Sequence, residues 1–234
     1  SLMPHILIDP RNVHDGAMTI TDPQALHHLL DVLRVTGGGR VECVDGAGRW
    51  YAARVVRRSK RELQLEIVDQ GEEPRFALAV WLVQALIRPE RFEWLVQKTT
   101  ELGVERISPV MTARSIIRPS GERRVGRLDR WQRIAKEAAQ QCGRATVPQI
   151  DPPAVFGKVL ASLAGVGSDP NPPTPQPKAP SLVLMPTLAG NTVPLREALA
   201  GRSVLTSAAV LIGPEGDFTP EEVALAQRYG AVPV

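Results

Sequence analysis

The residues best suited to hold a ligand form a short loop near the end of the chain. An apolar stretch, residues 208–212, predicts a strand and is followed by Gly213, Pro214, Glu215 and Gly216. Two glycines three positions apart let the backbone turn tightly and approach a ligand closely. In an open α/β sheet, ligands bind beyond the carboxyl ends of strands, and this loop lies at such an end. An ordinary strand–helix turn is the alternative, and the turn chemistry alone favours it.

The side chains of this loop are acidic. Glu215 and Asp217 are present, whereas the lysine of a phosphate-binding loop is missing. An acidic loop favours a neutral or cationic ligand over a nucleotide triphosphate. The next helix has a clear start, because Thr219 is a typical N-cap, Pro220 suits the first helical position, and Glu222 completes a capping box.

Basic side chains concentrate in the middle third of the chain. The formal net charge is +3, but it divides into −1 over residues 1–75 (10 basic, 11 acidic), +6 over 76–150 (13 and 7) and −2 over 151–234 (5 and 7). Arginine, whose planar fork suits phosphates, dominates the middle third, and such a stripe is typical of nucleic-acid binders. For the part that lies on a predicted helix, a solvated helix face is an equally good interpretation. The stripe consists of Arg106, Arg114, Arg118, Arg123, Arg124, Arg127, Arg130 and Arg133.

Other polar groups carry weaker signals. Lys98 and Glu101 are spaced as a helical ion pair, and Glu137, Gln141 and Arg144 share one edge of a predicted helix. The two cysteines lie 99 positions apart and predict neither a disulfide framework nor a zinc site, so we expect no metal. The same cysteine pattern predicts a reducing, cytoplasmic location. No apolar run reaches 18 residues, so we expect no membrane-spanning helix and no membrane partner.

The elements that must position these residues fall into two parts. Residues 1–73 predict short strands around one helix, which indicates a small antiparallel barrel or sandwich. Residues 74–234 alternate strands and helices, which is the α/β signature. A long helix is predicted over residues 123–142, and the proline-rich stretch 168–180 is predicted to be an extended linker.

Several blocks of the sequence resemble one family, the 16S rRNA uridine-N3 methyltransferases of the RsmE type. The most specific blocks are Glu137-Ala-Ala-Gln-Gln-Cys-Gly-Arg144 and Leu211-Ile-Gly-Pro-Glu-Gly216. The resemblance implies a PUA-like RNA-binding β-barrel over 1–73 and a SPOUT methyltransferase domain with a trefoil knot over 74–234. It also implies S-adenosylmethionine as cofactor, 16S rRNA of the small ribosomal subunit as substrate, and a homodimer. The family's last knot segment is expected beyond Val234.

Site residues follow from the resemblance and from the charges. The cofactor would contact the loops after two strands, at Met185, Thr187, Ile212, Gly213, Pro214, Glu215 and Gly216. Uridine N3 must lose a proton or be stabilised as an anion, and the candidates for these roles are Arg114, Glu137 and Arg144. The candidate RNA contacts are Arg11, Arg34, Lys98, Arg118, Arg123 and Arg124. The alternative function is a non-catalytic RNA-binding factor of ribosome assembly; tRNA ribose methylation matches less well.

Overall fold

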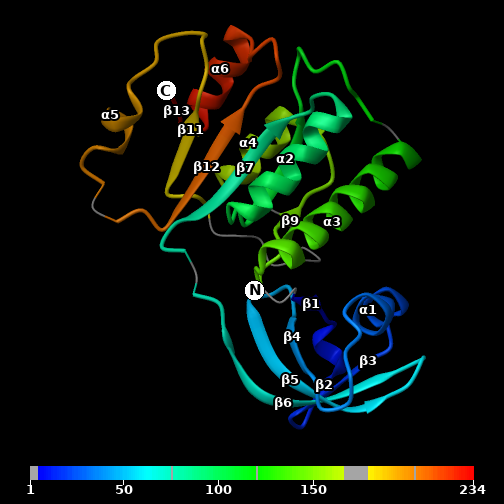
Figure 1. Ribbon diagram of the computed structural model, residues 1–234. Coiled ribbons are helices and arrows are strands. Elements are labelled where there is room, and N and C mark those ends of the chain that lie inside the picture. The colour runs from blue at the N-terminus through cyan, green and yellow to red at the C-terminus, as the bar shows by residue number, and fades with distance from the viewer. Residues whose placement is uncertain (1–4, 75, 120, 166–178, 203) are drawn as a thin grey trace. The chain divides into compact units, whose positions relative to one another are not determined.

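The computed structural model describes residues 5–74, 76–119, 121–165, 179–202 and 204–234. The chain divides into two compact units (Figure 1). The first contains Ser1–Arg75 together with Ala135–Val147, and the second contains Phe76–Ile134 and Pro148–Val234. The long helix therefore contributes its last residues to the N-terminal unit, which the predicted division into 1–73 and 74–234 does not include.

The N-terminal unit is built on one six-stranded sheet. Its strands follow the order β1-β4-β5-β6-β3-β2. The β1–β4 pair is parallel and the other pairs are antiparallel, so the sheet is mixed rather than wholly antiparallel as predicted. The long connection between β1 and β4, which includes helix α1 (Pro23–His27), permits this parallel pairing. The strands are β1 (Ile6–Leu7), β2 (Val13–His14), β3 (Ala17–Ile20), β4 (Arg40–Val44), β5 (Arg49–Arg58) and β6 (Leu63–Glu72).

Helix α1 covers the core of this unit. Its N-cap is Asp22, whose carboxylate accepts a hydrogen bond from the Ala25 amide at 2.8 Å, with Pro23 at the first helical position. The chain continues through a wider π-type turn, His28–Val32. Leu26 and Leu29 are buried against the strands, as their helical spacing predicts.

The C-terminal unit contains a wholly parallel sheet of order β10-β8-β7-β12-β11-β13, with β9 also paired to β8. This confirms the predicted α/β class. Because all pairs are parallel, the carboxyl ends of neighbouring strands meet at one edge of the sheet. The strands are β7 (Ala79–Ala85), β8 (Arg106–Met111), β9 (Gln149–Ile150), β10 (Ala154–Val155), β11 (Leu182–Met185), β12 (Ser207–Ile212) and β13 (Ala231–Pro233).

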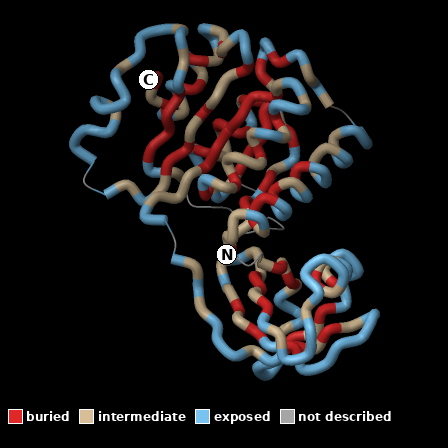
Figure 2. The backbone as a smooth tube through the Cα atoms, viewed as in Figure 1, coloured by how far each residue is buried: buried red, intermediate tan, exposed pale blue. Residues whose placement is uncertain are grey.

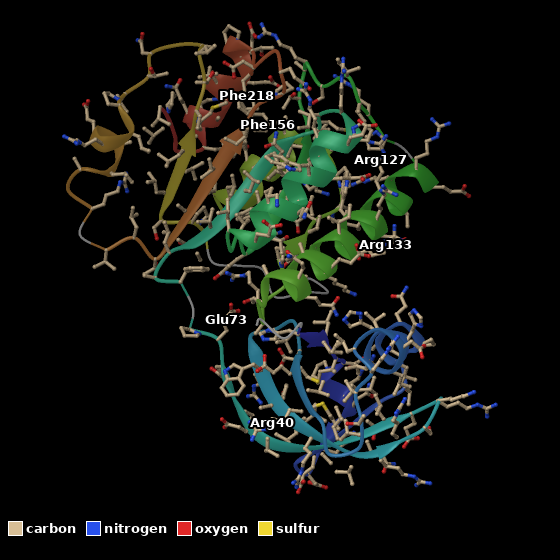
Figure 3. All side chains as sticks on the ribbon, viewed as in Figure 1. Arg40, Glu73, Arg127, Arg133, Phe156 and Phe218 are labelled. Carbon is tan, nitrogen blue, oxygen red and sulfur yellow. The ribbon has the colours of Figure 1, made fainter. Side chains whose placement is uncertain are left out.

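Helices pack against this sheet and enclose its core. Side chains of α4 and α6 join those of β7, β11 and β12 in one buried cluster. Within it the rings of Phe156 and Phe218 stack with centroids 5.1 Å apart (Figure 3). Figure 2 shows the sheet strands as the most continuously buried part of the unit. The helices are α2 (Pro89–Glu101), α3 (Glu122–Cys142), α4 (Phe156–Leu163), α5 (Leu195–Leu199) and α6 (Pro220–Arg228).

An aromatic contact and an ion pair join helices α2 and α3. The rings of Phe92 and Trp131 lie 4.5 Å apart, and Arg130 donates to Glu93 at 2.5 and 2.7 Å. This ion pair lowers the pKa of the Glu93 carboxyl, mainly through the hydrogen bond from Arg130. These contacts hold the first half of α3, which carries the stripe arginines from Arg123 to Arg133, on the C-terminal unit.

Replacing Phe92 with Ala is expected to destabilise the C-terminal unit by about 3–5 kcal/mol, because Phe92 is 1% exposed and its removal leaves a cavity. Urea unfolding followed by tryptophan fluorescence measures the effect. Trp94→Ala on the same helix is the matched control, because Trp94 is 63% exposed. Equal shifts for the two variants would show that Phe92 does not anchor the helix.

The remaining sequence predictions concern the second half of the chain. Strand β13 begins at Ala231 and extends the sheet beside β11. The predicted linker 168–180 lies outside the described residues except at its last two positions. The trefoil knot stays a prediction. Within the described residues, no helix is both long and apolar enough to cross a membrane.

Candidate active site

Three loops meet the carboxyl edge of the parallel sheet. They follow β8, β11 and β12 and comprise residues 112–118, 186–194 and 213–219. Strand β12 lies between β7 and β11, and β8 lies on the other side of β7. The sequence predicts ligand contacts in all three loops, and the sheet order brings them to the same edge.

Arg114 connects the first loop to the glycine-containing loop. Its Nη1 donates hydrogen bonds to the carbonyl oxygens of Gly216 and Phe218, at 2.5 and 3.3 Å. A Cβ atom at Gly216 would lie 3.4 Å from the Arg114 Cδ, so the arginine packs directly on the glycine backbone. A buried turn holds the arginine, because the hydroxyls of Thr112 and Ser115 lie 2.8 Å apart and the Thr112 amide donates to Ser115. A predicted catalytic residue thus contacts the predicted cofactor loop.

Asp217 joins the glycine-containing loop to the loop after β11. Its Oδ2 accepts hydrogen bonds from the Thr187 hydroxyl at 2.9 Å and from the Leu188 amide at 2.7 Å. Its Oδ1 accepts from the Phe218 amide at 2.7 Å. The backbone of Asp217 has φ +60°, a left-handed conformation that Asp tolerates better than most residues. One carboxylate therefore fixes two loops that are 30 residues apart.

The charge of Asp217 is retained by these bonds. Burial works to raise its pKa, but the donors Leu188, Phe218 and Thr187 and the positive charge of Arg114 outweigh burial, so the pKa is lowered. Glu215 is exposed, and its Oε1 lies 3.8 Å from Arg91 Nη1. The loop edge thus holds two carboxylates, and each has an arginine beside it: Arg91 at Glu215 and Arg114 at Asp217.

Glu222 connects the start of α6 to the loop after β8. The predicted capping box is confirmed, with Thr219 as N-cap and Glu222 bonded back to it. The second oxygen of Glu222 accepts a hydrogen bond from the Ala113 amide at 2.7 Å. The capping residue Glu222 therefore also fixes the backbone of Ala113, the residue that precedes Arg114.

The Gln84 side chain and the close packing around Gly213 support the start of the glycine-containing loop. Gln84, 2% exposed on β7, donates to the carbonyl oxygens of Ala85 and Gly213 at 3.1 and 3.5 Å. A Cβ atom at Gly213 would lie 3.2 Å from Asp217 Oδ1 and from the Phe218 ring, so this position requires close backbone packing. Sequence reasoning did not select Gln84, although a lone amide in an apolar strand is a detectable signal.

The other predicted cofactor contacts differ in accessibility. The Met185 side chain is fully buried in the core, and its carbonyl oxygen accepts from the Val234 amide at 3.1 Å. Pro214 is buried, whereas Ile212 and Thr187 are half-buried. Met185 can therefore line a ligand site with its backbone but not with its side chain.

Glu137 and Arg144 belong to the N-terminal unit, through the segment Ala135–Val147. Glu137 is exposed on α3. Arg144 is only 14% exposed, and its Nη2 lies 3.9 Å from Glu73 Oε1, while the Thr146 hydroxyl donates to Glu73 at 2.5 Å. These contacts attach the segment after α3 to the end of β6, so Arg144 has a structural partner within this unit.

The predicted RNA contacts also differ in how far they are engaged. Arg11 donates to both oxygens of Asp9, which lowers the pKa of that carboxyl to about 2, mainly through the side-chain hydrogen bond. Lys98 pairs with Glu101 at 2.9 Å. Arg118 donates to two backbone carbonyls of the loop after β8.

Three arginines near the start of α3 remain available. Within the described chain, the side chains of Arg123, Arg124 and Arg127 make no hydrogen bond or ion pair, and Figure 3 marks Arg127 on α3. Arg34 is exposed too, at φ +52°. Arg106 is engaged, because it pairs with Asp151 at 2.8 Å and lies over the Trp81 ring. Among the described residues there is no cluster of three or more metal-binding side chains.

Comparison with known families defines the class of protein. Residues 74–234 match the family described as RNA methyltransferase domain, and residues 20–68 match the family described as RNA methyltransferase PUA domain. The first match includes every loop of the candidate site. The fold and these matches together define an RNA methyltransferase with an attached PUA domain.

Individual relatives narrow this class. The chain is 31% identical to the ribosomal RNA small subunit methyltransferase E of Synechocystis, over 98% of this chain and 69% of that protein. It is 28% identical to the Mycobacterium tuberculosis protein of the same name, over 94% and 79%. The chain therefore belongs to the small subunit methyltransferase E (RsmE) family, which confirms the resemblance found in the sequence.

Solved structures of similar sequence have the same fold. A ribosomal RNA small subunit methyltransferase E from Neisseria gonorrhoeae, bound to S-adenosylmethionine, is 28% identical and superposes with a TM-score of 0.77 over 99% of this chain and 88% of that one. A putative methyltransferase from Legionella pneumophila, in complex with the same cofactor, is 26% identical with a TM-score of 0.79 over 100% and 88%.

Proposed function

We propose that this protein transfers a methyl group from S-adenosylmethionine to N3 of one uridine in the 16S rRNA of the small ribosomal subunit. One observation carries the proposal. In this chain, which belongs to the RsmE family, side-chain hydrogen bonds of Arg114, Asp217 and Glu222 connect three loops at the carboxyl edge of the parallel sheet. Ligands of open α/β sheets bind at this edge. We further propose a homodimer acting in the cytoplasm, where ribosomal subunits are the substrate.

The residues of the loop edge fit this cofactor. S-adenosylmethionine is a sulfonium cation that supplies an electrophilic methyl group. Glu215 and Asp217 place negative charge in the loop, which contains no lysine, and this charge favours a cation and offsets the neighbouring Arg91 and Arg114. We assign cofactor contacts to Thr187, Ile212, Gly213, Pro214, Glu215 and Gly216, and to the backbone of Met185.

The reacting nitrogen needs help from the protein, because N3 of uridine carries a weakly acidic proton. A cation that stabilises the N3 anion and a base that accepts its proton meet this need. Arg114 is the leading candidate for the cation. Its Nη1 is bound to carbonyl oxygens, while Nε and Nη2 make no hydrogen bond with any described residue. Arg144 is the second candidate for the cation, and Glu137 is the candidate base.

Paired substitutions distinguish catalysis by Arg144 from positioning. If Arg144 only attaches the segment after α3 to β6, Arg144→Ala and Glu73→Gln should lower kcat to a similar extent, because each removes one half of the same contact. Single-turnover methyl transfer at saturating RNA measures this, and urea unfolding reports the shared loss of stability. A loss of rate in Arg144→Ala alone, at unchanged stability, would assign Arg144 to the reaction itself.

Calorimetry and methyl transfer test the proposed function. The protein is titrated with S-adenosylmethionine and then incubated with labelled cofactor and small ribosomal subunits, with unmodified tRNA as the control substrate. Saturable cofactor binding and label on the subunits alone are expected. No heat at near-millimolar cofactor would instead support a non-catalytic assembly factor, and label on tRNA would support ribose methylation.

A further inference from the structure

The N-terminal unit carries a basic surface that its total charge conceals. Residues 1–75 have a net charge of −1, yet four of the six residues 57–62 are basic. These residues form the end of the β5–β6 hairpin, which reaches past the neighbouring strands of its unit (Figure 1). We call Arg57, Arg58, Lys60 and Arg61 the hairpin cations.

The hairpin cations have no acidic partner among the described residues. All four are exposed, and within the described residues their side chains make no hydrogen bond or ion pair. The other arginines of β5 differ, because Arg54 pairs with Glu66 at 2.7 Å and Arg49 lies 3.7 Å from Glu72. The acidic side chain in the turn, Glu62, accepts a hydrogen bond from Gln64. Charge is therefore segregated along the hairpin.

A β-bulge keeps Arg57 on the exposed face. Val55 pairs with Leu65 and Arg57 pairs with Gln64, so Val56 is the extra residue. Cross-strand partners share a face of the sheet, and without the bulge Arg57 would be paired with the buried Leu63. With the bulge, Arg58 is the residue opposite Leu63, at the last position of β5, and both arginines are exposed.

The turn itself is held rigidly. The Ser59 hydroxyl accepts hydrogen bonds from the amides of Arg61 and Glu62, at 3.2 and 3.0 Å, and the Ser59 amide donates to the Glu62 carbonyl at 2.9 Å. Lys60 and Arg61 occupy the two central positions, where side chains point away from the strands. A preorganised turn lowers the entropic cost of binding through these residues.

The chemistry of the hairpin end specifies its ligand. Four cations without a paired acid attract a polyanion, and the planar guanidinium groups suit phosphate oxygens. Residues 56–62 contain no aromatic side chain on which a base could stack. We propose that the hairpin cations bind the phosphate backbone of the RNA substrate, independently of its sequence. The choice of RNA rests on the proposed function.

Salt-dependent RNA binding tests this proposal. Full-length protein in which all four hairpin cations are changed to Ser is titrated with deproteinised 16S rRNA at several salt concentrations. If two of the four contact phosphates, affinity should fall roughly 25-fold at about 0.1 M salt, and the slope of log affinity against log salt should become shallower by about 1.4. In a second variant, Arg57, Arg58 and Arg61 are changed to Lys and Lys60 is kept. This variant keeps all four charges, so it should have most of the wild-type affinity.

Two controls make the result decisive. Arg49→Ser with Arg54→Ser removes two cations that are already paired with acids in the same hairpin, and it should leave affinity and slope nearly unchanged. Cofactor binding should be unaffected by the hairpin change. Wild-type affinity and slope in the hairpin variant would overturn the proposal, as would a loss of binding to assembled subunits but not to bare rRNA, which indicates a protein partner.

The test also separates this proposal from the proposed function. Methyl transfer by the wild-type protein with unchanged RNA affinity in the hairpin variant would reject the hairpin surface alone. Reduced RNA affinity in the variant, with no methyl transfer by the wild type, would support the hairpin surface and reject the methyltransferase assignment.

Discussion

Replacing Asp217 with Asn is expected to weaken S-adenosylmethionine binding about 10- to 100-fold. Asn tolerates the left-handed backbone at φ +60° but has only one acceptor oxygen. The Asn oxygen can accept either from the Phe218 amide or from the Thr187 and Leu188 donors, and the donors that it does not reach lose their acceptor. Lost hydrogen bonds to a charged group are worth about 1.5–3 kcal/mol each, and about 1.4 kcal/mol corresponds to tenfold.

Calorimetric titration with the cofactor measures this loss. Glu197→Gln is the matched control, because it removes one exposed acid on α5 of the same unit, away from the loop contacts of Asp217. An Asp217→Asn variant with the affinity of the control would show that the link between the two loops does not organise the cofactor site.

The same link predicts a dependence on pH. The pKa of Asp217 is lowered in the folded protein, so its contribution to stability is present above its ordinary value of 3.8. That contribution is lost as pH falls through the lowered pKa. Cofactor affinity should therefore not decline through Asp217 between about pH 8 and pH 5, and a decline in that range must come from other groups.

Changing Arg123, Arg124 and Arg127 to Ala is expected to reduce rRNA affinity roughly 100-fold at about 0.1 M salt. The three side chains make no hydrogen bond or ion pair with any described residue, so each can neutralise a phosphate, and each contact contributes about 0.7 to the salt slope for single-stranded RNA. The wild-type slope is expected to be about −3 to −4 if five basic residues meet phosphates.

Arg130 provides the internal comparison for this variant. It lies on the same helix but pairs with Glu93 at 2.5 Å, so Arg130→Ala should change affinity much less than any of the three. Filter binding across a salt series gives both affinity and slope. A flat salt response of the wild type would refute the helix as an RNA surface.

Local patterns predicted much of the C-terminal unit. The capping box at Thr219 and the strand before Gly213 follow from residue types within a few positions, and both are confirmed. The residues of β7 are mostly apolar and are buried on both faces, because parallel sheets are covered on both sides. Such features depend on neighbouring residues alone, so the sequence contains the information needed.

The hydrogen bonds between the loops after β8, β11 and β12 could not be predicted from local patterns. Glu222 and Ala113 are 109 positions apart, and no periodicity relates them. Asp217 appeared in the sequence as an acidic loop residue, but its bond to the Leu188 amide depends on the placement of β11 beside β12. The parallel pairing of β1 with β4 was missed for the same reason, because a strand of two residues carries too little pattern to reveal its partner.

The hairpin end shows how averaging over a segment hides a surface. A net charge of −1 over residues 1–75 gave no indication of an RNA contact at the hairpin, and the contacts expected in this segment were Arg11 and Arg34. The structure divides those charges, because acids neutralise Arg11, Arg49 and Arg54, while the hairpin cations are left exposed. Ion pairs across strands, rather than composition, decide which cations remain available.

The position of the transferred methyl group tests the central claim most directly. Small subunits from a strain lacking this gene are incubated with the purified protein and cofactor, and the rRNA is mapped by primer extension and by mass spectrometry of nuclease fragments. A methyl group on N3 blocks base pairing, so the account predicts one new extension stop, at a single uridine of 16S rRNA, together with 3-methyluridine in that fragment. A methyl group on a ribose or another base atom, or no transfer, would contradict it.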